Sequence, residues 1–266
     1  MVILLFTIRQ WLFHKWVLAY ILALVATNIF ITYAAFFGLG WVQPEFYGRV
    51  AVSVVNASIF LVSLTSLILG FFIYQEDREG GLYEWFISRP VIRSSYLLQR
   101  WLGLAASLGI SAAVAFAASA VAVWLLTTVF LTQVIAIGAV MVMLTLSLSA
   151  LGFLLSQFTS DKVAALGAGF FLWLYLNFVH GLIAFVLALF LPAPQIFLFV
   201  VTSPVESARF LSFYAVDPTL SFINPVTAYD VSTSLGSAIL TVPLIILLAP
   251  PILLFIYISL EKLTTK

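Results

Sequence analysis

The sequence has 266 residues, of which 64% are hydrophobic and only 8% are charged, whereas a soluble domain carries roughly 25% charged residues. A soluble fold of this length could not bury so much apolar surface, so we predict an all-α integral membrane protein with one transmembrane domain over residues 1–266. The net charge of +1 gives no electrostatic reason to bind nucleic acid. Because cysteine is absent, disulfides and thiolate metal sites are excluded.

The first 15 residues predict a helix that lies on the cytosolic face of the membrane. Arg9, His14 and Lys15 are polar positions among apolar neighbours, and Trp11 is expected at headgroup depth. A spanning helix needs about 20 apolar residues. Six later stretches meet this length, at approximately 16–38, 51–74, 96–126, 131–157, 163–191 and 236–259.

The basic residues predict the orientation of these spans. Only Arg49 and Arg209 fall on the side of the loops that follow the first and fifth spans. The other basic residues share the side of the termini: Arg9, Lys15, Arg78, Arg89, Arg93, Arg100, Lys162, Lys262 and Lys266. Since basic residues concentrate on the cytoplasmic side, both termini and the loops 75–95 and 157–162 are predicted to be cytosolic, at a plasma membrane.

Two stripes of small residues predict faces where helices pack closely. Lipid gives no hydrophobic drive between helices, so small side chains are what allow two backbones to approach. A translocation path is the alternative interpretation of the stripes. Their members are Gly103, Ser107, Ser111, Ala115 and Ser119 in the third span, and Gly138, Thr145, Ser149, Gly152 and Ser156 in the fourth.

The stretch between the second and third spans is unusually polar and predicts an amphipathic helix over 76–89. Leu82, Trp85 and Phe86 share one helical face, and Pro90 ends the helix. The aromatic face could dock into a groove on a soluble partner or could rest on the membrane surface. The carboxylates allow both interpretations, as docking charges or as solvated charges that keep the loop out of the bilayer: Glu76, Asp77, Glu79 and Glu84.

The outer segment 192–235 predicts two short helices that cap the bundle or re-enter it. Ser203, Pro204 and Glu206 form a capping box with proline at the first helical position, and Arg209 follows in the same helix. Asn224 and Pro225 give a second start signal, with asparagine as the cap.

Few residues offer chemistry, so we predict no catalytic site and no enzyme. There is no GxxxxGK[ST] loop that could bind ATP phosphates. Within the spans we single out His180 and, three residues before it, Asn177; they are predicted to share one face, as a translocation-path candidate or as an interhelical hydrogen bond. Met141 and Met143 point to opposite sides of a helix, so no metal site is predicted.

The polar stretch resembles the type-2 permeases of ABC transporters. The resemblance rests on an acidic cluster, a glycine, an amphipathic turn, Ser-x-Pro, a basic residue and a leucine-rich start to the third span. These features are Glu76, Gly81, residues 83–87, Ser88, Pro90, Arg93, Leu97 and Leu98, with Leu82 where the pattern has threonine. Within the family, Gly80–Gly81, Ser203–Pro204, Arg209 and Leu211 are similar to the NosY-like permeases of nitrous-oxide-reductase maturation.

This resemblance implies a permease that is driven by separate P-loop ATPase subunits, which would bind the ATP and Mg²⁺, and that has no cofactor of its own. It implies a second permease subunit, either another copy of this chain or a close relative, together with a coupling helix over 76–89 and an outer gate in 192–235. It further implies export of a sulfur- or copper-related species, with a periplasmic or extracellular maturation protein as a partner. The alternatives are a type-2 exporter of a lipid, drug or polysaccharide, a secondary transporter without an ATPase, or a membrane scaffold.

Overall fold

The computed structural model describes residues 2–38, 47–88, 92–127, 132–216 and 235–264, and all regular structure in these ranges is helical. Six helices are long and apolar enough to cross a membrane. This confirms the prediction of an all-α integral membrane protein with six spans. The spans are Lys15–Phe37, Arg49–Glu79, Arg93–Ala122, Gln133–Ser156, Lys162–Leu187 and Ala238–Leu260.

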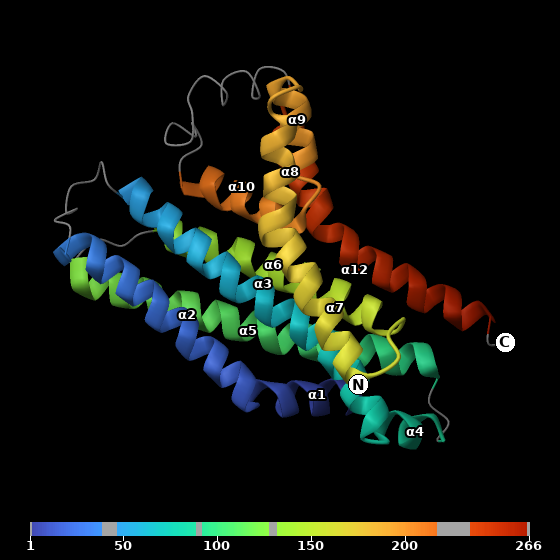
Figure 1. Cartoon of the computed structure of the whole chain (residues 1–266). Coiled ribbons are helices and arrows are strands. Elements are labelled where there is room, and N and C mark those ends of the chain that lie inside the picture. Colours follow the sequence, from blue (N-terminus) through green and yellow to red (C-terminus); the bar gives the residue numbers. More distant parts are fainter. Residues whose placement is uncertain (1, 39–46, 89–91, 128–131, 217–234, 265–266) are drawn as a thin grey trace.

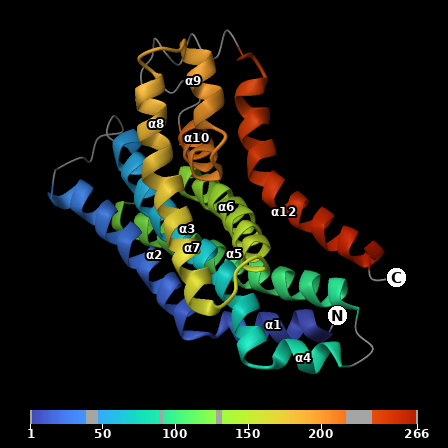
Figure 2. The ribbon, with the colours of Figure 1, turned by 45° about the vertical axis from the view of Figure 1, so that its right-hand side comes forward.

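The helices form a tilted bundle in which α4 and both ends of the chain lie toward one end, and α9 lies toward the other (Figures 1 and 2). The elements up to the fourth span are α1 (Val2–Leu12), α2 (Lys15–Tyr33), η1 (Ala34–Gly38), α3 (Tyr47–Glu79), α4 (Leu82–Ile87), α5 (Arg93–Thr127) and α6 (Thr132–Ser156). The later elements are α7 (Lys162–Leu174), η3 (Tyr175–Val179), α8 (His180–Leu187), α9 (Ala193–Val200), α10 (Pro204–Val216) and α12 (Ala238–Thr264).

Helix α6 is the centre of the bundle, because it contacts α3, α5, α10 and α12. Its closest neighbour is α3. A Cβ atom built on Gly152 would lie 2.4 Å from the carbonyl oxygen of Leu67, and one built on Gly70 would lie 2.6 Å from that of Ser149. Glycine on both sides therefore sets the distance between these two helices. Every residue of the two small-residue stripes is buried, as expected of packing faces.

Helix α1 packs into the bundle against α5, so Trp11 lies among protein side chains, and its position at headgroup depth stays a prediction. Trp11 is fully buried, with its ring edge toward Phe72. Gly103 makes room for Thr7, whose Cβ would lie 2.5 Å from a Cβ at that position. Apolar residues also lie on the face of α1 that does not contact α5, since Leu5 and Phe6 are exposed.

The predicted helix over 76–89 is broken in two by a glycine pair. Residues 76–79 continue α3, and Gly81 has a φ angle of 70°, in the left-handed region that glycine enters without steric cost. The amide of Gly80 donates to the carbonyl of Glu76, as in a helix end. Only the six residues of α4 therefore form a separate short helix.

The outer segment contains a bent pair of helices, with α9 and α10 at 114° to each other. Helix α10 starts at Pro204 as predicted and re-enters the bundle, where it contacts α3, α6 and α12. The capping box is wrong: the Ser203 hydroxyl is buried without a described partner, and Glu206 pairs with Arg209 instead. The second helix start, Asn224–Pro225, lies outside the described residues.

The crossing of α3 and α6 generates a stability prediction. We expect Gly152→Ala to lower the stability of the purified protein by about 1–3 kcal/mol, because the new methyl group meets backbone that cannot move aside. Gly167→Ala is the matched control, since a Cβ there has open space, and a helical alanine is worth about 0.5–1 kcal/mol over glycine. Thermal unfolding in detergent measures both, and equal melting temperatures would contradict the close approach.

Candidate functional site

An aromatic side chain of the short helix α4, Tyr83, packs against the ends of two spans. The ring of Tyr83 packs edge-on against Tyr74 of α3 and Tyr96 of α5, with centroid distances of 5.9 and 5.8 Å. The guanidinium of Arg93 lies 5.8 Å from the centre of the same ring, a cation–π contact. Tyr83 therefore holds one face of α4 against the ends of both neighbouring spans.

Two other side chains of α4 are exposed. Trp85 is 48% exposed, and Glu84 is also exposed. Leu82 is half-buried and Gly81 is exposed. The Phe86 side chain and Pro90 lie outside the described residues. Helix α4 thus combines an anchored inner face with an outer face that carries an aromatic ring and a carboxylate.

Beneath α4 lies a buried ion pair between α3 and α5. The Arg100 side chain is fully buried; its Nε donates to Oδ2 of Asp77 at 2.6 Å, and its second terminal nitrogen pairs with Oδ1. The Tyr96 hydroxyl donates to the same Asp77 carboxylate. Such two-pronged pairing satisfies both charges, which could not otherwise remain ionised away from water.

The ion pair also fastens α1. The remaining terminal nitrogen of Arg100 donates to the hydroxyl of Thr7 and to Oε1 of Gln10, each at 3.0 Å. Asp77 and Arg100 therefore join α1, α3 and α5 at a single point. The expectation that Asp77 is a surface charge of the loop is wrong, because it points into this network and is buried.

The end of α3 is tied on its other side to the turn between α6 and α7. The Gln75 amide nitrogen donates to the carbonyl of Ser156 at 2.6 Å and to the hydroxyl of Thr159 at 2.7 Å. A Glu79 carboxylate oxygen accepts from the backbone amide of Lys162 at 3.1 Å. Glu76 is half-buried. The end of α3 is thus a junction that contacts α4, α5, the end of α6, the turn after α6 and the start of α7.

In the same turn, Asp161 caps the start of α7. Its carboxylate accepts from the amide of Ala164 at 2.7 Å and from the hydroxyl of Ser160. These hydrogen bonds to the charged form lower the pKa of Asp161. The start of the fifth span is therefore fixed next to the end of α3.

Sequence reasoning missed this network. Within the spans the sequence singles out His180 and Asn177, whereas the structure places Asp77 and Arg100 inside two of the spanning helices. One available signal was that Arg100 falls within an apolar stretch, where a charge needs a partner. Another was its spacing of four residues from Tyr96, which places both on one helical face.

Asn177 and His180 do not share a face, because Asn177 lies inside the π-helical turn η3, which ends directly before His180. The Asn177 amide donates to the Ser63 hydroxyl of α3 at 3.2 Å and to the Trp173 carbonyl at 3.0 Å. His180 lies 3.1 Å from the Thr202 hydroxyl and stacks on Phe199 of α9. Each makes an interhelical contact; their role in a translocation path stays a prediction.

The residues proposed for an outer gate gather at the bend between α9 and α10. Ser203, Pro204 and Glu206 are buried, and Arg209 is half-buried against the Glu206 carboxylate. Within the described ranges, no group of three or more His, Asp or Glu side chains could hold a metal ion. What the described contacts do at this bend is hold α9 and α10 in place.

Comparison with known proteins identifies a family. The model of the family described as "ABC-2 family transporter protein" matches residues 7–260, nearly the whole chain. No curated protein matches the sequence. The match identifies the family but no individual member of it, so it does not support the narrower resemblance to NosY-like permeases.

The ion pair generates a prediction about stability. We expect Arg100→Met to cost about 3–5 kcal/mol, because it leaves the Asp77 carboxylate buried and uncompensated. Adding Asp77→Leu to that variant should restore part of the loss, since an apolar pair leaves no buried charge. Arg9→Met, at an exposed position on α1, is the control. Thermal unfolding gives the ranking, and a double variant less stable than Arg100→Met would refute this account.

Proposed function

The chain belongs to the ABC-2 transporter family, as a membrane permease subunit that works with a separate ABC ATPase, and we propose that α4 is the helix through which that ATPase moves the bundle. The observation that carries the proposal is the two-sided character of α4. Tyr83 fixes its inner face to α3 and α5, while Trp85 and Glu84 are exposed on the outer face. Exposed aromatic anchors contribute much of the energy of protein interfaces.

The junction below α4 supports a mechanism. Displacement of α4 acts on Tyr83, and hence on the last turn of α3 and the first turns of α5. Asp77 and Arg100 then oblige α3, α5 and α1 to move together. Closure of an ATPase pair would in this way be passed to the spans as a rigid-body motion.

Not every predicted docking residue can touch the ATPase. Glu79 and Glu84 are exposed and remain in the proposed interface, together with Gly81, Leu82, Trp85 and Phe86. Asp77 is buried, and Arg93 lies over the Tyr83 ring. We therefore propose that Asp77 and Arg93 pass the motion of α4 to the spans and do not contact the ATPase.

We further propose that both termini and α4 face the cytosol at a plasma membrane. The excess of basic residues on that side supports this orientation, and both chain ends and α4 lie toward the same end of the bundle (Figure 2). The chain has no cysteine, so single-cysteine variants report cleanly. We expect Gln195→Cys on α9 to react with an impermeant maleimide in intact cells, and Ser160→Cys to react only after lysis. The reverse pattern would invert the orientation.

The assembly and cargo are proposed from the resemblance to type-2 permeases. A second copy would pack beside the first; the fifth span supports this, since only 22% of its apolar window is buried within one chain. The bent α9–α10 pair, with Arg209 and Leu211, would form the outer gate of an exporter. A sulfur- or copper-related cargo for nitrous-oxide reductase would be shown by copper-site assembly that depends on this chain and its ATPase; assembly without the chain would exclude it.

The docking proposal generates a prediction. We expect Trp85→Asp to reduce co-purification of a P-loop ATPase with the tagged chain by about tenfold or more, because removal of a central aromatic anchor commonly costs 2 kcal/mol or more. Quantitative mass spectrometry and ATP hydrolysis in the purified complex measure the loss. Thermal unfolding of the variant alone checks that its fold is intact.

Trp124→Asp is the matched control. Trp124 is 49% exposed, almost the same as Trp85, but it lies at the opposite end of α5 from α4. We expect this variant to keep its ATPase. Full ATPase retention by the Trp85 variant, or equal loss in both variants, would show that α4 is not the docking element.

A further inference from the structure

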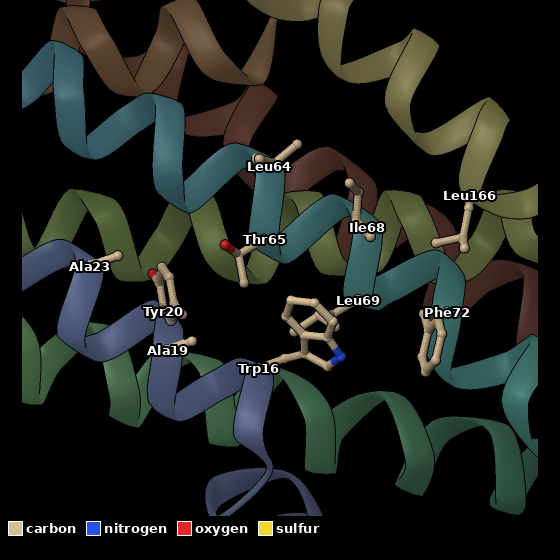
Figure 3. Close-up of a pocket in the computed structure, with 10 residues that line it drawn as sticks. All are labelled: Trp16, Ala19, Tyr20, Ala23, Leu64, Thr65, Ile68, Leu69, Phe72 and Leu166. Atoms are coloured by element: carbon tan, nitrogen blue, oxygen red, sulfur yellow. The ribbon is translucent and has the colours of Figure 1, made fainter.

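An apolar groove opens between α2, α3 and α7, with a volume of about 460 Å³. Figure 3 shows Trp16 and Ala23 on α2, Thr65 and Phe72 on α3, and Leu166 on α7 around it. This volume lies in the range of roughly 300–1,000 Å³ that small-ligand sites occupy. The groove is therefore large enough to take a chain-like apolar ligand.

The groove lies toward the α4 end of the bundle. Its residues come from the first turns of α2, the second half of α3 and the second turn of α7. On α2 they run from Trp16 to Ala23, which is about 10–12 Å of helix, less than half of the ~30 Å hydrocarbon core. An occupant would thus lie along the helices within a single leaflet.

Two hydrogen-bond donors of different elements stand at the same end of the groove, around Phe72. The Nζ of Lys162 lies 4.1 Å from the centre of the Phe72 ring. In Figure 3 the indole nitrogen of Trp16 is on the side of its ring that faces Phe72, and Trp16 is 58% exposed. A cation and a neutral N–H donor above an apolar slot match a phosphate group attached to a hydrocarbon chain.

The carboxylates around Lys162 are occupied elsewhere. Asp161 accepts from the amide of Ala164 and the hydroxyl of Ser160, and Glu79 accepts from the Lys162 backbone amide. Neither forms an ion pair with the Lys162 ammonium among the described contacts. That ammonium faces an aromatic ring, and it can receive an anion without breaking a salt bridge.

We propose that this groove binds a glycerophospholipid from the surrounding membrane, with one acyl chain between α2, α3 and α7 and its phosphate between Trp16 and Lys162. The groove separates the start of α2 from the part of α3 that directly precedes Gln75 and Asp77. Such a lipid would brace α2 against α3 next to α4. The proposal does not depend on the identity of the ATPase or of the cargo.

Native mass spectrometry of the purified chain tests the site. The probes are dioleoyl-phosphatidylglycerol and dioleoylglycerol, which share acyl chains but differ in the phosphate. We expect one tightly retained phosphatidylglycerol per chain and about tenfold weaker retention of dioleoylglycerol, from the loss of charge-assisted hydrogen bonds. Equal retention of the two lipids would overturn the assignment of the phosphate.

Variants with matched controls locate the binding. Ala23→Phe should fill the groove and abolish retention, while Ala117→Phe, at an exposed alanine of α5, should not. Lys162→Gln with Trp16→Phe should lower phosphatidylglycerol retention about tenfold, and Arg9→Gln should leave it unchanged. Retention by the Ala23 variant would refute the groove.

A second copy of the chain is the competing occupant of this face. In a chain otherwise free of cysteine, Ala19→Cys should be reactive to a lipid-soluble maleimide and should not form a disulfide-linked dimer under oxidation. Efficient disulfide dimers through that position would mean that the groove is covered by protein, and the lipid proposal would be wrong.

Discussion

The pairing of Asp77 with Arg100 is the interaction on which the organisation of this permease depends. A buried ion pair contributes little net stability, but its geometry is demanding, because both charges must be satisfied at once. Here the demand is met by three helices: α3 supplies the carboxylate, α5 the guanidinium and a tyrosine hydroxyl, and α1 the acceptors Thr7 and Gln10. Helices α3 and α5 cannot separate at this end without leaving a charge unpaired, and separation of α1 would leave one guanidinium nitrogen without its two acceptors.

Packing against α6 complements this polar fixation. In a membrane, apolar side chains gain nothing by leaving lipid for protein, so close contact must come from shape. Gly70 and Gly152 let α3 and α6 approach until backbone meets backbone, and Gly138 similarly accepts Phe116 of α5. The bundle thus has a rigid centre of backbone contacts and an end fixed by charge. Helix α4 is attached to the fixed end, next to the junction of α1, α3 and α5.

The sequence predicted the elements better than the contacts between them. Hydropathy and length located six spans, because a run of about 20 apolar residues matches the thickness of the hydrocarbon core and is rare in soluble proteins. Pro204 located the start of α10 for a local reason, its fixed φ and missing N–H. The break at Gly80–Gly81 was also local in origin, but the amphipathic pattern on both sides concealed it. Proposed roles for Asn224, Pro225 and Pro90 lie outside the described residues and stay predictions.

Contacts between distant residues were not predictable in the same way. Asp77 looked like one of four loop carboxylates, and nothing in its neighbours distinguishes it from Glu76 or Glu79. Only the fold brings Arg100 to it, across 23 residues. Asn177 and His180 were expected on one face because regular helical spacing places them there. The π-helical turn changes that spacing, and it directs one side chain to α3 and the other to α9.

The α3 end carries three different contacts that converge within a few residues. Phe72 faces the groove beneath Lys162, Gln75 holds the α6–α7 turn, and Asp77 holds α5 and α1. Since these residues lie within about two helical turns, a rotation of this short segment would alter all three together. A segment that changes its groove contact, its turn contact and its ion pair in one step has few intermediate arrangements. Two discrete positions of the bundle are what an ATP-driven permease requires.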